Sequence, residues 1–332
     1  MSRNFRVPVI DISAFQVGAP ATRASLARLV DDTFTESGFM VIVGHGIPDA
    51  VIQEAKTAAR RFFAQDEDEK LRWQRLGDRS HGYFPKDSIA SARYGDRKDA
   101  PPDLMESYAV GSSGPAPWAP RVAVEAVAGT NTWPDSPAGF QPAVARYFAA
   151  VEELAGQLMR LFALALRLDE EYFVSFYTPY IGVQRMNLYS RLVQEPQPGQ
   201  IRIGEHTDLG GFTVLSADPV SGGLQIQDPD GNWHDIDAPE NSFVINLGDL
   251  MQAWTNDRWR ATLHRVVNPR TPEQNVDRLS VAFFANPNPE TVCECIPTCL
   301  DPGAEPLYAP FVAGEFRQRR MATQHVASQG LD

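Results

Sequence analysis

The stretch GEHTDLGGFTVLSAD, residues 204–218, carries the strongest signals for both fold and function. It places His206 and Asp208 two residues apart, followed by two glycines and a β-prone run. Along a strand, residues i and i+2 point to the same face, so this imidazole and this carboxylate can reach a common point. The two residues form either a hydrogen-bonded pair at a strand end or two ligands of a metal site. A metal site needs a third ligand from elsewhere in the chain.

Short β-type runs separated by turn signals surround this stretch. The clearest turns are Asp228-Pro229-Asp230-Gly231 and Asn256-Asp257. Seven or so short strands at this spacing predict a β-sandwich or a jelly-roll barrel. The runs lie at 181–190, 212–218, 223–228, 231–236, 242–249, 261–267 and 278–287.

The first half of the chain has mostly helical periodicity. Apolar spacing predicts helices over 21–37 and 49–64, and the strongest helix follows Pro142. Strands are expected at 7–13 and 39–47, and long loops with short elements at 72–120. We expect one domain over 1–332, built from a mostly helical region (1–175), a jelly-roll core (180–290) and a C-terminal helical segment (291–332).

Composition and charge limit the classes of function. The chain has 332 residues, 43% of them apolar, and a net charge of −12. Such an acidic surface argues against nucleic acid or an anionic membrane as the main partner. The N-terminus has no secretory h-region, and no apolar run reaches the ~18 residues of a membrane span. Three clustered cysteines, Cys293, Cys295 and Cys299, favour a reducing cytoplasm.

The candidate third ligand is His264, in ATLHRVV. It follows Asp208 by enough residues for intervening strands to return the chain to the same pocket. Two His and one carboxylate leave three coordination positions open, which is the arrangement of non-haem Fe(II) oxygenases.

A second polar pair follows at Arg278 and Ser280, in DRLSVAFF, again at i, i+2 spacing on an otherwise apolar strand. An arginine that points into a barrel is costly unless it meets an anion. A guanidinium beside a hydroxyl suits a buried carboxylate. The alternative is an edge arginine paired with a nearby aspartate.

These motifs together resemble the Fe(II)- and 2-oxoglutarate-dependent dioxygenases of the isopenicillin N synthase-like family. The resemblance extends to VPVIDIS, SGFMVIVGHGIP, NLYS and GGLQIQDPDGNWHDI, and so covers most of the chain. It implies a mainly β fold with flanking helices around a double-stranded β-helix (jelly-roll) core. Two departures are Ser190, where the family often has Pro, and Asn256-Asp257, where it often has Asn-Gly.

The resemblance also implies roles for individual residues. His206, Asp208 and His264 match the iron ligands, and Arg278 and Ser280 match the positions that hold the distal carboxylate of 2-oxoglutarate. Asn187 and Tyr189, which precede the metal motif, match residues that contact 2-oxoglutarate in the family. Because Ser190 departs from the family pattern, Tyr189 either makes this contact or simply packs.

The implied reaction uses Fe(II), 2-oxoglutarate and O2 to oxidise a C–H bond of a small molecule, with succinate and CO2 as coproducts. The outcome is hydroxylation, desaturation or ring closure. Two alternatives remain open: an iron oxidase of the same family that does not use 2-oxoglutarate, and a non-catalytic jelly-roll binding protein.

Substrate contacts are the least defined part of the prediction. By the resemblance, the regions of Tyr83 and Phe84 and of Phe311 and Phe316 flank the iron, and core packing is the alternative for each residue. The remaining histidines and the cysteines are not expected to bind metal, since structural zinc needs four ligands and the cysteine spacing is wrong. These histidines are His45, His234 and His325.

Overall fold

The computed structural model describes residues 5–74, 81–94, 97–112, 131–177, 181–218 and 222–321, and two β-sheets form its centre. A third, two-stranded sheet pairs β13 (Val292–Cys293) with β14 (Phe311–Val312). The strands of the large sheet, in spatial order, are β1 (Val9–Asp11), β2 (Phe39–Val43), β10 (Phe243–Leu247), β7 (Phe212–Ala217), β12 (Arg278–Asn286), β5 (Ile181–Tyr189), β4 (Glu106–Gly111) and β3 (Gly82–Phe84). Those of the small sheet are β6 (Ile203–His206), β11 (His264–Val266), β8 (Leu224–Gln227) and β9 (Trp233–Asp235).

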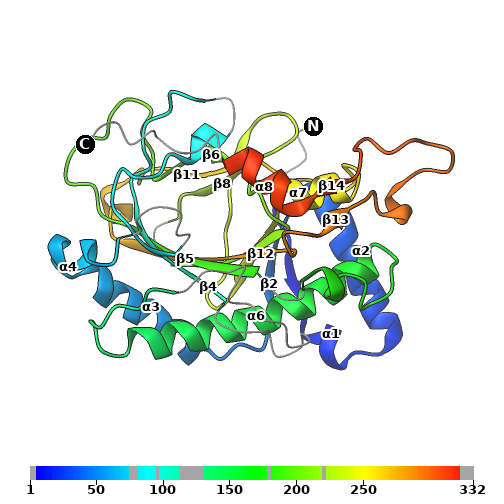
Figure 1. Ribbon diagram of the computed structural model, residues 1–332, viewed down its shortest axis with the longest axis horizontal. Helices are drawn as coiled ribbons and strands as arrows, with labels where there is room; N and C mark the ends of the chain where they lie inside the picture. Colours follow the sequence, from blue (N-terminus) through cyan, green and yellow to red (C-terminus); the bar gives the residue numbers. More distant parts are fainter. Residues whose placement is uncertain are drawn as a thin grey trace.

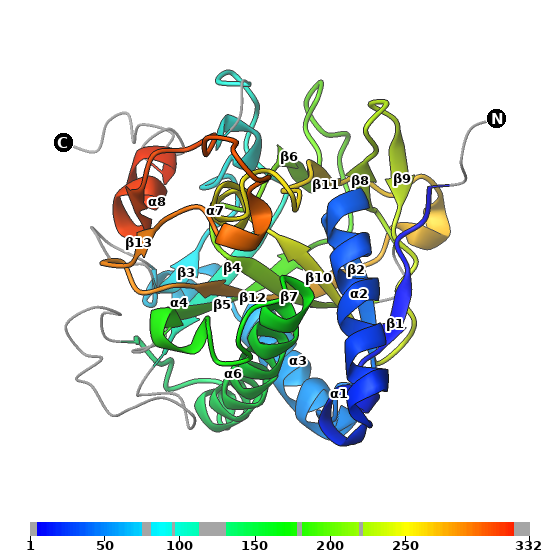
Figure 2. The same cartoon turned by 90° about the vertical axis from the view of Figure 1, so that its right-hand side faces the viewer.

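Helices cover the outer face of the large sheet. Helices α3 and α6 lie side by side beneath β5 and β12 (Figure 1), and α2 runs beside β2 (Figure 2). The long apolar stripe of α6 supplies much of this core, because its residues recur at helical spacing. The helices are α1 (Ser13–Val17), α2 (Pro20–Glu36), α3 (Asp49–Phe63), α4 (Glu67–Leu71), α6 (Phe140–Ala165), α7 (Asp249–Trp254) and α8 (Ala313–Met321).

Strand β12 shows how the large sheet separates two environments. Leu279, Val281 and Phe283 belong to the hydrophobic core on the helix side. Because side chains alternate along a strand, Arg278 and Ser280 point to the opposite face. That inner face is turned toward the small sheet, and a second hydrophobic cluster joins the two sheets. Its members are Phe39, Val41, Met105, Tyr189, Ile203, Leu224, Ile226, Val244 and Val266.

The predicted strands and helices are confirmed to within four residues at their ends, including the strand at 278–287, and the long helix predicted after Pro142 begins at Phe140. The segment 72–120 contains two strands, β3 and β4, that the sequence did not define. All six residues of β4 are buried, so the strand lacks the alternation that marks a half-exposed strand. The far end of the predicted C-terminal helical stretch and His325 lie outside the described residues.

Candidate metal centre

His206, Asp208 and His264 converge on one point between the two sheets. The two histidines are direct partners in the pairing of β6 with β11, and their ring centroids lie 4.2 Å apart. Each Nε2 lies 3.8 Å from Oδ1 of Asp208. One ligand atom from each residue lies within 4.8 Å of the others, and no other His, Cys, Asp or Glu group of this kind occurs among the described residues.

Backbone carbonyls fix the orientation of both imidazoles. His206 Nδ1 lies 2.8 Å from the carbonyl oxygen of Gly204, and His264 Nδ1 lies 3.0 Å from that of Thr262. A carbonyl only accepts hydrogen bonds, so each Nδ1 carries the proton and each Nε2 presents its lone pair to the centre. Burial lowers the pKa of His206 to about 4, with repulsion from His264 as the next cause, which favours the neutral imidazole that binds metals.

Two side chains of the large sheet hold the carboxylate of Asp208. Its Oδ2 accepts hydrogen bonds from Thr213 Oγ1 at 2.5 Å and Asn246 Nδ2 at 2.7 Å, which leaves Oδ1 directed at the imidazoles. Burial alone would raise the pKa of Asp208, but the two histidines and these hydrogen bonds outweigh it and lower the pKa. Asp208 is therefore a carboxylate with one free oxygen, as a metal ligand must be.

The glycines of the opening stretch allow close approach of the backbone at this centre. A Cβ on Gly211 would lie 2.3 Å from the hydroxyl of Tyr177, and one on Gly248 would lie 2.3 Å from the carbonyl oxygen of Gly210. The Gly248 turn carries the backbone N–H of Asp249, which donates to the carbonyl of Asp208 at 2.7 Å. Any side chain at either glycine would push apart the loop that carries Asp208.

On the inner face of β12, a buried cation has no counter-ion among the residues that the structure describes. Arg278 is 2% exposed, and its Nε and Nη1 have no hydrogen-bond partner. The guanidinium carbon lies 5.1 Å from the ring centroid of Tyr189, whose hydroxyl is 3.2 Å from Ser280 Oγ. Asn187 Nδ2 lies 3.5 Å from the same Oγ, and its buried Oδ1 is also unpartnered. The four predicted residues therefore form one cluster with spare hydrogen-bonding capacity.

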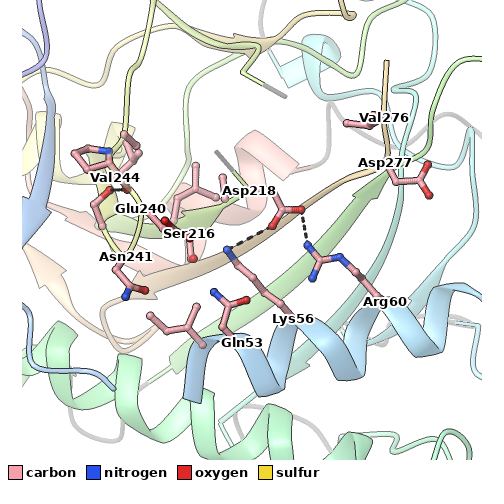
Figure 3. A pocket seen from close by; sticks show the side chains of 16 residues that line it. Gln53, Lys56, Arg60, Ser216, Asp218, Glu240, Asn241, Val244, Val276 and Asp277 are labelled. Atoms are coloured by element: carbon pink, nitrogen blue, oxygen red, sulfur yellow. Dashed lines mark hydrogen bonds and ion pairs between the residues drawn. The ribbon is translucent and has the colours of Figure 1, made fainter. Parts of the chain in front are cut away.

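The carboxylates of Asp218 and Asp277, near Arg278, already accept hydrogen bonds from other groups. Asp218 accepts from the backbone N–H of Leu279 at 2.8 Å and from Arg60 at 2.7 Å, and it lies 3.6 Å from Lys56 Nζ. Figure 3 shows these two basic side chains of α3 directed at Asp218, in a cleft of about 390 Å³. Asp277 accepts from the backbone N–H of Arg191. Arg278 consequently remains available for an external anion.

Arg202, which sequence reasoning missed, lies at the same cluster. It is fully buried, its Nη2 donates to the carbonyl of Val276 at 2.9 Å, and its Nε and Nη1 have no partner. Its guanidinium carbon is 5.9 Å from the Tyr189 ring centroid. Burial, followed by repulsion from Arg278, lowers the pKa of Arg202. The signal in the sequence was an arginine in the apolar approach to His206, and it lacked the i, i+2 hydroxyl partner that marked Arg278.

The four predicted substrate residues lie in different places. Tyr83 faces the helices, where it packs against Phe62 and donates a hydrogen bond to Glu106 at 2.6 Å, so it lies on the opposite face of the sheet from the metal centre. Phe84, the next residue, faces inward. Phe311 and Phe316 contact each other at 5.0 Å and pack against the helix-side core.

The other histidines and the cysteines stay outside the centre. His45 Nε2 lies 2.9 Å from the carbonyl oxygen of Asn241, and His234 pairs with Asp228 at 2.7 Å on β9. The three cysteines are free, and burial raises the pKa of Cys293 to about 12.

A jelly-roll sheet pair that brings two neutral imidazoles and one carboxylate together, with an unpaired guanidinium deeper in the same barrel, defines a non-haem iron oxygenase. The 2OG-Fe(II) oxygenase superfamily matches residues 180–287, and the family described as non-haem dioxygenase in morphine synthesis N-terminal matches residues 7–136.

Known proteins resemble the chain over nearly its whole length. The 2-oxoglutarate-Fe(II) type oxidoreductase hxnY of Emericella nidulans is 32% identical, over 94% of this chain and 89% of its own. Validamycin A dioxygenase of Streptomyces hygroscopicus subsp. limoneus is 29% identical, over 90% and 80%. A full-length Neurospora crassa protein, crystallised in complex with alpha-KG and thymine, superimposes with a TM-score of 0.83 at 30% identity, over 97% and 99% of the two chains.

The chain belongs to the 2OG-Fe(II) oxygenase superfamily. It is an Fe(II)- and 2-oxoglutarate-dependent dioxygenase, and the predicted fold class, enzyme class and cofactors are confirmed. Its relatives include proteins that act on small molecules. Within the described residues, every helix is too short or too polar to cross a bilayer.

Proposed function

We propose that His206, Asp208 and His264 are the iron ligands of this dioxygenase. The observation that carries this assignment is the arrangement of lone pairs: both Nδ1 atoms and Asp208 Oδ2 are engaged, which leaves two Nε2 atoms and one Oδ1 directed at one point. This donor set suits Fe(II), which the three side chains would hold with positions left open for 2-oxoglutarate and dioxygen.

Arg278 and Ser280 hold the distal carboxylate of 2-oxoglutarate in this proposal, and Tyr189 and Asn187 complete its hydrogen bonds. The fit rests on the unpartnered Nε and Nη1 of Arg278 and on the absence of a carboxylate pairing with it among the described residues. Arg202 adds a second guanidinium at the same place. Two unpaired guanidiniums repel each other, and a bound carboxylate relieves that repulsion.

The chain itself supplies orientation and exclusion of water. The carbonyls of Gly204 and Thr262 keep both Nε2 lone pairs directed at the iron, and Thr213 and Asn246 hold Asp208 in one rotamer. Bound iron with 2-oxoglutarate and dioxygen supplies the oxidising power for C–H cleavage, with succinate and carbon dioxide as coproducts. Buried walls around the centre keep bulk water from competing with the substrate.

The substrate is a small organic molecule in this proposal. Phe84 faces the barrel interior and is retained as a wall of its site, whereas Tyr83 is not. A role for Phe311 and Phe316 stays a prediction. A reducing compartment such as the cytoplasm suits the three free thiols, and we infer that all 332 residues act as one oxygenase unit.

Anaerobic binding measurements test the proposal. Wild-type chain should bind one Fe(II) and then one 2-oxoglutarate, with a weak visible charge-transfer band. Arg278→Ala should bind iron normally and lose the band at 2-oxoglutarate concentrations that saturate the wild type. A wild-type band in Arg278→Ala would contradict the assignment of the carboxylate site.

A further inference from the structure

A second cation without a counter-ion lies on the inner face of β5. Arg185 is half-buried, its Nε is buried without a hydrogen-bond partner, and no carboxylate among the described residues pairs with it. The contact that the structure gives its guanidinium is the ring of Phe84, with Cζ 5.0 Å from the centroid. A buried Nε–H without a partner is costly unless a ligand supplies an acceptor, and an anion is the acceptor that suits a guanidinium.

Strand register places Arg185 between the metal centre and the cosubstrate cluster, which is the group of Arg278, Ser280, Tyr189 and Asn187. Arg185 lies opposite Ala282 of β12, whereas Asn187, two residues on, lies opposite Ser280. Two residues further along β12, Phe284 lies opposite Thr213 of β7, which donates to Asp208. Residues two apart on a strand are separated by about 7 Å. Along the strand direction, Arg185 is thus one such step from Ser280 on the neighbouring β12 and one from Thr213, which lies one strand farther across the sheet.

The surroundings of Arg185 combine aromatic rings with small side chains. Its opposite neighbours on β4 and β12 are Ala109 and Ala282, whose side chains are single methyl groups. Phe84 contacts the guanidinium, and the half-buried Phe284 shares the inner face of β12 with Arg278 and Ser280. Flat apolar surfaces beside a planar cation suit a flat ligand that carries an anionic oxygen group.

We propose that Arg185 is a specificity-determining residue that binds an anionic oxygen group, such as a carboxylate, of a planar substrate packed against Phe84 and Phe284. This inference rests on the proposed function, because it takes the iron centre and the Arg278 cluster as the two fixed ends of the site. It narrows the substrate class to ring-bearing organic acids. It also explains why Arg185 lies next to the cosubstrate cluster without a carboxylate partner among the described residues and without joining that cluster's hydrogen bonds.

Anaerobic calorimetric titration of the chain loaded with Fe(II) and 2-oxoglutarate tests the proposal without turnover. The probes are three planar acids (benzoate, pyridine-3-carboxylate and indole-3-carboxylate) and their neutral carboxamides. At least one acid should bind about ten-fold or more tightly than its amide, as a charge-assisted hydrogen bond requires. Arg185→Gln should abolish that preference, Arg185→Lys should restore part of it, and the surface control Arg146→Gln should leave it unchanged. Arg146 pairs with Glu54 on the exposed side of α6.

Equal affinity for acids and amides in the wild type, or an acid preference that survives in Arg185→Gln, would overturn the inference. Binding of 2-oxoglutarate is measured in the same samples. It should be unchanged in Arg185→Gln, and its loss there would move Arg185 into the cosubstrate cluster and also contradict the inference. Failure of 2-oxoglutarate to bind the wild type would instead contradict the proposed function, so the two failures are distinguishable.

Discussion

Asn246 Nδ2 donates a 2.7 Å hydrogen bond to Oδ2 of Asp208, and it is one of two side chains that decide which carboxylate oxygen faces the imidazoles. Asn246 lies on β10 and Asp208 in the loop after β6, so the large sheet orients a ligand carried by the small sheet. The ligand set therefore depends on how the two sheets are packed against each other, as well as on the ligands themselves.

Removing this hydrogen bond should weaken iron binding while the ligands stay in place. In Asn246→Ala, Asp208 loses one of its two orienting donors, and Fe(II) affinity should fall by about ten-fold to a hundred-fold. Anaerobic Fe(II) titration measures the effect, with the exposed turn variant Asn232→Ala as the control. Unchanged Fe(II) affinity in Asn246→Ala would mean that Thr213 alone fixes the carboxylate.

The two guanidiniums of the cosubstrate cluster should be separable by kinetics. Arg278→Ala should raise the KM for 2-oxoglutarate by about a hundred-fold, with much less effect on the KM for substrate, because a charge-assisted pair is lost. Arg202→Met should raise the KM for 2-oxoglutarate by only about ten-fold. The variant loses one cation that attracts the carboxylate, but it also loses the repulsion between Arg202 and Arg278, and the two effects partly cancel. Initial rates of succinate formation give both constants, and parallel changes for both ligands would indicate a folding defect instead.

A methyl group at Gly211 should disturb the metal loop more than the fold as a whole. Its Cβ would meet the Tyr177 hydroxyl at 2.3 Å and the Ala285 carbonyl oxygen at 2.9 Å, so the loop must shift. Gly211→Ala should lower the free energy of unfolding by about 1–3 kcal/mol and weaken Fe(II) binding. The double variant Gly211→Ala, Tyr177→Phe should recover part of both losses. If neither stability nor Fe(II) binding recovers in the double variant, the clash with the Ala285 carbonyl oxygen, and not the one with Tyr177, causes the losses.

Stability should depend on pH through a buried carboxyl in α6. Burial raises the pKa of Glu152 from 4.5 to about 7. Between these values the folded chain holds a proton that the unfolded chain releases, so this group makes stability fall as pH rises from about 5 to 7. Glu152→Gln should therefore stabilise the protein at pH 8 by about 1–3 kcal/mol and have little effect at about pH 4.5. Urea unfolding at both pH values checks this, and an equal effect at the two would contradict it.

The sequence pointed to the proposed ligands but did not identify the side chains that orient them. His206, Asp208, Arg278 and Ser280 stood out by residue type and i, i+2 spacing, His264 by residue type, and the family resemblance implied their roles. The strand argument holds for His206, whereas Asp208 lies in the loop after β6. The orienting residues are ordinary polar side chains of strands, and their role depends on register between strands distant in sequence. These residues are Thr213 and Asn246.

Tyr83 and Phe84 are a second case in which the sequence was insufficient, because it did not give the orientation of their side chains. Both are aromatic and adjacent, and sequence alone could not say which faces the barrel. A shift of one residue exchanges the two faces of a strand. The pairing of β3 with β4 determines the two orientations, because Phe84 contacts Arg185 inside the barrel and Tyr83 contacts Phe62 on the helix side.

Iron stoichiometry after anaerobic reconstitution tests whether His206, Asp208 and His264 hold the metal. Wild-type chain is incubated with excess Fe(II), desalted and analysed for metal, beside Asp208→Ala, His206→Ala and His264→Ala, with His234→Ala as a histidine control outside the centre. We expect one iron per chain in the wild type and the control, and little in the three ligand variants, all with unchanged far-ultraviolet circular dichroism. Wild-type iron content in any folded ligand variant would show that the metal is held elsewhere.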